Sequence, residues 1–141
     1  MKQLYNVSVL LSFLFFSACG KDFLKSYDRR IIGAWYITGV NRVGLGGNTD
    51  QVSFKDGRIT FNEDGSLTYI NPSGAVYQGH WDIVKKTIGD DTQRSLQLTA
   101  VDFASQHVLG EYYDDMNFVS ADHFKASIAL NFHTYVTHFR R

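Results

Sequence analysis

Short runs in which apolar and polar residues alternate recur along the chain from residue 31 onward. Such alternation places every second side chain on one face of an extended strand, and is typical of half-buried β-strands. Eight runs fit this pattern at an average repeat of about a dozen residues, which favours an all-β barrel or sandwich. They are Ile31–Val43, Arg58–Asn62, Ser66–Ile70, Val76–Val84, Leu96–Ala100, Met116–Phe118, Phe124–Leu130 and Thr134–Arg140. Val52–Phe54 is a possible short ninth strand, and no stretch shows a helical period.

Turn residues separate several of these runs. Asp56-Gly57 and Asp64-Gly65 are flanked by alternating residues, which is among the strongest local signals of a β-hairpin. Asn71–Gly74 supplies another turn. Gly79, inside a predicted strand, indicates a bend or bulge of the kind a barrel needs in order to close.

Two stretches lack a clear strand pattern. Lys85–Arg94 is polar and is expected to form a loop. Residues 102–115 are expected to form a long loop, or one helical turn through residues 103–107.

The first 18 residues have the features of a secretion signal. Lys2 precedes an apolar run, Val7–Phe16, that is too short to span a bilayer. The sequence Phe16-Ser17-Ala18-Cys19-Gly20 resembles a bacterial lipobox, although Phe16 stands where that signal usually has leucine. The resemblance implies cleavage before Cys19 and lipidation of its thiol. The alternatives are cleavage after Gly20 and a buried free thiol.

This interpretation divides the chain into a lipoprotein signal peptide (1–18), a tether after the lipidated cysteine (19–30) and a barrel domain (31–141). One helical turn is expected in the tether. Lys21-Asp22 faintly resembles the export tags of surface lipoproteins in the Bacteroidota. We therefore expect a lipid anchor in a bacterial outer membrane, on its periplasmic or surface-exposed side. Removing 18 of the 141 residues leaves 123 residues that contain the only cysteine, so no intrachain disulfide can form.

The first strand contains Gly33-Ala34-Trp35, and the chain ends in Arg140-Arg141. These residues resemble the first-strand signature and the terminal arginine of the calycins, a group that includes the lipocalins. The resemblance implies an eight-stranded, up-and-down antiparallel barrel, here without the C-terminal helix of typical lipocalins. It also implies that Trp35 plugs the closed end, that Gly33 lets the backbone pass close to the covering group, and that Arg140 or Arg141 lies across the indole.

Residues suited to catalysis or metal binding do not form a recognisable motif. The five histidines contain no His-x-His pair, and His133 and His138 would face opposite sides of one strand. A nucleophile-and-base set could be assembled from Asp102, Ser105 and His107, but nothing indicates a nucleophile elbow or an oxyanion hole. We expect a non-enzymatic protein with no cofactor, catalytic residue or metal site. Equal numbers of acidic and basic residues, 14 of each, argue against nucleic acid as a partner.

Aromatic residues are abundant, with 11 Phe, 8 Tyr and 2 Trp. We expect Tyr69, Tyr77, Trp81 and Phe124 to face the interior, with the first three near the mouth opposite Gly33. If the interior is hollow, these residues would line a cup for a small hydrophobic or amphipathic ligand. If it is packed, a protein-binding or inhibitor module of the cell envelope is the alternative. Sequence alone cannot separate a hollow barrel from a packed one.

Overall fold

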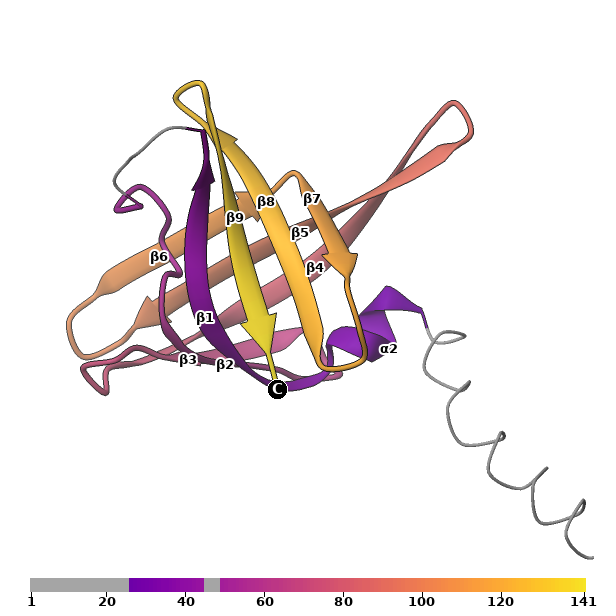
Figure 1. The fold of residues 1–141 in the computed structure, drawn as a ribbon. Helices are drawn as coiled ribbons and strands as arrows, with labels where there is room; N and C mark the ends of the chain where they lie inside the picture. Colours follow the sequence, from indigo (N-terminus) through magenta and orange to yellow (C-terminus); the bar gives the residue numbers. More distant parts are fainter. Residues whose placement is uncertain (1–25, 45–48) are drawn as a thin grey trace, which may run out of the picture. The chain divides into compact units, whose positions relative to one another are not determined.

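A computed structural model describes residues 26–44 and 49–141 (Figure 1). The signal segment, Cys19, Lys21-Asp22 and most of the predicted tether lie outside these residues. A single turn of helix, α2 (Tyr27–Ile31), follows Ser26, whose carbonyl accepts hydrogen bonds from the amides of Arg29 and Arg30. None of the helices in the described part of the chain is long and apolar enough to cross a bilayer.

The chain divides between Arg30 and Ile31, and residues 31–141 form one compact unit. Within its described residues there are nine strands, which confirms the all-β prediction. They are β1 (Gly33–Val43), β2 (Gly57–Phe61), β3 (Ser66–Ile70), β4 (Val76–Ile88), β5 (Asp91–Asp102), β6 (His107–Tyr113), β7 (Asp115–Phe118), β8 (His123–Leu130) and β9 (His133–Arg140). Val52–Phe54 is not a strand, because it belongs to the connection between β1 and β2.

The strands form one antiparallel sheet in the order β6-β5-β4-β3-β2-β1-β9-β8-β7. Strands that are neighbours in the sheet are also consecutive in the chain, with one exception. The exception is β1 and β9, the first and last of these strands, which pair with each other. Strands β6 and β7 lie at opposite edges of this ladder, although only Asp114 separates them in the chain. Among the described residues, the hydrogen-bonded ladder is therefore not closed.

Two predicted loops contain strands. β4 and β5 continue as a hairpin through residues 84–95, from the pair Val84–Ser95 to the pair Ile88–Asp91, and extend past their neighbours in Figure 1. Because both faces of this ribbon are largely exposed, its composition is polar and hides the strand pattern. The predicted loop at residues 102–115 contains a short turn and then β6, which is why the structure has nine strands and not eight.

Inward-facing side chains fill the centre of the unit with aromatic rings. Phe124 stacks on Phe139 with a centroid separation of 4.3 Å and meets Trp35 edge-on at 4.7 Å. A second group forms where Phe54 packs edge-on against Tyr69 at 5.0 Å, and Tyr69 contacts Tyr77 at 5.7 Å. Phe54 comes from the β1–β2 connection and is fully buried. This connection therefore contributes to the core.

Candidate functional site

The end of the sheet near the start of β1 is closed around Trp35. This side chain is fully buried, and its indole Nε1 donates to the carbonyl of Ile31 at 2.6 Å. The guanidinium of Arg141 lies over the indole at 4.1 Å and donates to the carbonyl of Ile32 at 2.8 Å. Gly33 has a φ of +117°, and a Cβ there would lie 3.8 Å from the Arg141 guanidinium. A positive φ of this size is unfavourable for residues other than glycine, so glycine is favoured at this position beside Arg141.

The arginine over Trp35 is Arg141 and not Arg140. Arg140 is the last residue of β9, is exposed, and pairs with Tyr36 on one side and His123 on the other. Successive residues of a strand point to opposite faces. Because Arg140 faces outward, the next residue, Arg141, can turn inward and lie over the Trp35 indole.

The four residues proposed to line a ligand cup do not lie together. Tyr69 and Tyr77 belong to the group around Phe54. Phe124 contacts Trp35, and Trp81 meets Phe61 edge-on at 5.6 Å. Trp81 also donates from Nε1 to the carbonyl of Asn62 at 3.0 Å. Since Phe61 pairs with Gly33, Trp81 lies at the Trp35 end, and its predicted place at the mouth is wrong.

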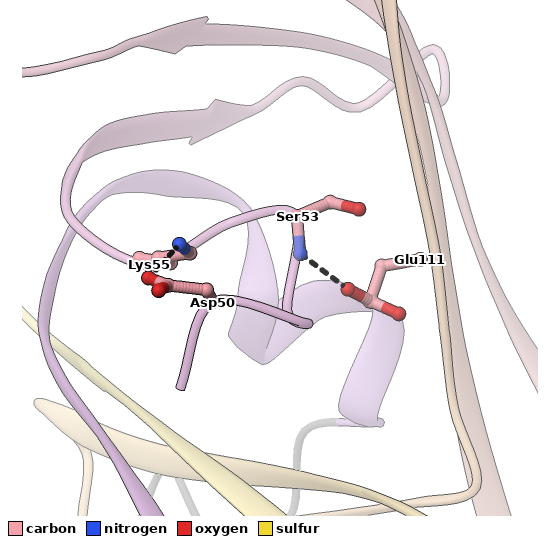
Figure 2. A network of polar contacts seen from close by, with 4 residues as sticks. All are labelled: Asp50, Ser53, Lys55 and Glu111. Atoms are coloured by element: carbon pink, nitrogen blue, oxygen red, sulfur yellow. Dashed lines mark hydrogen bonds and ion pairs between the residues drawn. The ribbon is translucent and has the colours of Figure 1, made fainter. Parts of the chain in front are cut away.

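The connection between β1 and β2 is held against β6 by polar contacts (Figure 2). The amide of Ser53 donates to the Glu111 carboxylate at 2.7 Å, and the Ser53 hydroxyl donates to the carbonyl of Gly110 at 2.9 Å. Lys55 pairs with Asp50 at 2.8 Å within the same connection. This exposed ion pair contributes little, whereas the bonds from Ser53 fix residues on either side of it, Val52 and Phe54, in the core.

Burial raises the pKa of two groups in contact with this connection. Desolvation raises the pKa of Glu111 above its ordinary value of 4.5, and the hydrogen bond from Ser53 opposes that rise. Desolvation, with the nearby Asp56 charge, raises the pKa of Tyr69 to about 12, and its hydroxyl donates to the carbonyl of Asp56 at 2.7 Å. Tyr77 Oη lies 3.1 Å from Nδ1 of His107. These polar groups are already engaged with the protein.

The raised pKa of Glu111 predicts a pH-dependent contribution to stability. A carboxyl with a raised pKa binds its proton more tightly in the folded chain, so its contribution is full below the unfolded pKa and is lost as the pH rises through the folded one. The melting temperature of the wild type should therefore fall relative to that of Glu111→Gln as the pH rises from 4 towards neutrality. Thermal denaturation across that range measures it, and parallel profiles would contradict the prediction.

A groove of ≈ 580 Å³ lies on the outer side of β3, β4 and β5. Polar and small residues supply much of its lining, including Thr68, Gln78, Gly79, His80 and Thr99. Phe103, in the turn after β5, forms part of the wall and leaves 65% of its surface exposed. Apolar side chains on neighbouring strands add to the apolar surface beside Phe103. They form two cross-strand pairs, Ile70 with Val76 and Val101 with Val108. The groove could not be predicted from the sequence, because it is assembled by the pairing of strands that are separate in the chain.

In the described part of the chain, the other polar residues considered above form neither a nucleophile-and-base set nor a group of three or more metal ligands. Ser105 Oγ donates to Asp102 at 2.5 Å and accepts from the backbone amide of His107, which is a turn arrangement without an imidazole base on the hydroxyl. The His107 ring instead contacts Tyr77. Within residues 26–44 and 49–141, no three His, Cys, Asp or Glu side chains are grouped to hold a metal ion.

Comparisons of the chain with protein-family models, curated proteins and solved structures found no match.

Proposed function

We propose that the protein is a lipid-anchored, non-enzymatic binding module of a bacterial outer membrane, with a lipocalin-like barrel that recognises a protein partner through its outer groove. The observation that carries this proposal is the contrast between the two sides of the sheet. The inner side is filled by rings at both ends, including Phe54 from the β1–β2 connection, whereas the outer side of β3–β5 has a groove with exposed apolar residues. A filled interior with an exposed apolar surface favours a partner over an enclosed small ligand.

The barrel part of the proposal is supported by the junction between β6 and β7. Asp114 accepts a hydrogen bond from Ser95 of β5 through its carbonyl at 3.0 Å, and from the amide of Ala129 of β8 through its carboxylate at 2.9 Å. Tyr113 of β6 also contacts Phe139 of β9 edge-on at 6.2 Å. In our interpretation, β6 and β7 are one bent strand that pairs with β5 in its first half and with β8 in its second. That count gives eight strands and a closed barrel.

The groove suits a protein segment. Thr68, Gln78 and Thr99 offer hydroxyl and amide groups to a partner's backbone, while Phe103 offers an apolar surface. Such a mixture is typical of protein interfaces, where apolar anchors are surrounded by hydrogen-bonding groups. An interior ligand would compete for space with buried rings such as Phe54 and Tyr69.

Site-specific photo-crosslinking of the full chain in its own cells tests the proposal. A photoreactive residue at Gln78 should give a discrete crosslinked protein that disappears when Phe103→Asp is added. The same residue at Thr38, an exposed position of β1, is the matched control and should not give that product. In the same cells, Cys19→Ala should move the protein from the membrane to the soluble fraction.

Three other results would contradict parts of this proposal. Identical products from Gln78 and Thr38, or a product that survives Phe103→Asp, would exclude the groove as the recognition surface. Binding of an apolar fluorescent dye that is abolished by enlarging Phe54 to tryptophan would favour the interior-ligand alternative. Retention of Cys19→Ala in the outer membrane would contradict the anchor.

A further inference from the structure

Two histidines from neighbouring strands meet on the outer side of the sheet, away from the groove. His123 begins β8 and His138 lies near the end of β9. The register pairs His123 with Arg140 and Lys125 with His138, so the two histidines are diagonal neighbours on one face. Their rings are 5.5 Å apart with an interplanar angle of 26°, and His123 Nε2 lies 3.2 Å from His138 Nδ1.

This separation suits two ligands of one metal ion. Two imidazole nitrogens on a tetrahedral zinc, each at about 2.0–2.1 Å, lie about 3.3–3.4 Å from one another. In the metal-free protein, one ring can donate its N–H to the other across the same 3.2 Å. Small ring rotations and a change of tautomer would then turn both lone pairs towards a bound ion.

Asn41 of β1 can fix the required tautomer. Its side-chain nitrogen Nδ2 lies 3.2 Å from His138 Nε2, the nitrogen on the far side of the ring from His123, and a flip of the amide exchanges Nδ2 with the oxygen Oδ1. With the amide oxygen turned to this position, Asn41 accepts an N–H from Nε2 and leaves Nδ1 free to bind a metal. A hydrogen bond of this kind to the distal nitrogen is the usual outer-shell support of a metal-bound histidine.

We propose that His123 and His138 form a surface site for a divalent transition-metal ion of the zinc, copper and nickel class. Imidazole ligands favour these ions over Mg²⁺ and Ca²⁺, which prefer oxygen. Water, or a side chain of another molecule, would complete the coordination. The site is independent of the partner groove, so either proposal can fail without the other.

Two positively charged side chains lie beside the histidine pair. Burial lowers the pKa of both histidines below the ordinary 6.5, and the positive charges of Arg140 and Lys125 lower it further, while Asp122 acts in the opposite direction on His123. Metal-bound imidazoles are neutral, so these shifts act in the direction that metal binding requires. The same two cations repel a bound metal ion, which predicts that removing one of them strengthens binding.

Calorimetric titration of the full chain at pH 7.5 with Zn²⁺, Cu²⁺ and Ni²⁺ tests the proposal. A Cys19→Ser background removes the thiol as a competing ligand. We expect one ion per chain, affinity reduced roughly tenfold or more by His123→Gln or His138→Gln, and no response to Mg²⁺. Lys125→Gln should increase the affinity, and His80→Gln, a histidine of the groove, should leave it unchanged.

Several results would overturn the site. These are no binding of any of the three ions, binding that persists in the double variant His123→Gln/His138→Gln, or equal loss in His80→Gln. Circular dichroism verifies that each variant is folded. Electron paramagnetic resonance of bound Cu²⁺ provides a second readout, because coupling to two imidazole nitrogens is expected in the wild type and to one in each single variant.

Discussion

Trp35→Ala is expected to lower the free energy of unfolding by about 3–5 kcal/mol, as large-to-small changes of buried aromatic residues do. The indole is fully buried, meets Phe124 at 4.7 Å and Phe118 at 6.1 Å, and its Nε1 satisfies the carbonyl of Ile31. Alanine would leave a cavity in this cluster and an unpaired carbonyl. For a domain of about 110 residues, the melting temperature should fall by roughly 12–20 °C, measured by thermal denaturation.

Arg141→Ala provides the comparison for this variant. It removes the guanidinium over the indole and its bond to the carbonyl of Ile32, but leaves the packing beneath intact. The expected loss is about 1–2 kcal/mol, from one cation–π contact and one hydrogen bond. A melting shift below about 2 °C for Trp35→Ala would show that the indole does not close this end of the domain.

Most of the strands could be predicted because their local signals agree. The Asp64-Gly65 turn separates two runs with clear alternation, and β2 and β3 begin and end within a residue of their predicted limits. The outer half of the β4–β5 hairpin could not be predicted in this way. Residues 84–88 and 91–95 pair only with one another in the sheet, so burial imposes no apolar pattern on them.

The positions of single side chains depended on strand register, which the sequence does not supply. Trp81 was expected at the mouth, but the register of β2 with β1 and its contact with Phe61 place it at the opposite end. His123 and His138 are separated by 15 residues and meet only because β8 and β9 pair in one particular register. Arg141 could be anticipated only as one of two adjacent arginines. The residues that share one face of a strand could thus be predicted, whereas the residues that they contact on neighbouring strands could not.

Gly79, where the sequence predicts a bend or bulge, pairs in regular register with both neighbouring strands, and the close packing of β4 against β5 accounts for this glycine instead. A Cβ at Gly79 would lie 1.8 Å from the carbonyl oxygen of Thr99 and 2.6 Å from the Cα of Ala100. Both obstacles are backbone atoms of the paired strand, so a side chain cannot relieve the clash by changing rotamer. Glycine is therefore required at this position by the close approach of two strands.

Gly79→Ala is expected to cost about 3 kcal/mol or more, at or above the upper end of overpacking effects, because β4 must separate from β5. Gly110→Ala is the matched control, since Gly110 pairs with Thr99 from the other side and has open space where a Cβ would be. That variant should be neutral or stabilising by up to about 1 kcal/mol, because it only restricts the unfolded chain. Urea denaturation measures both, and hydrogen exchange at the Thr99 and Ala100 amides should accelerate in Gly79→Ala alone. Equal effects of the two substitutions would show that β4 and β5 do not approach as closely in solution, and the groove that contains Gly79 would then lose its defined floor.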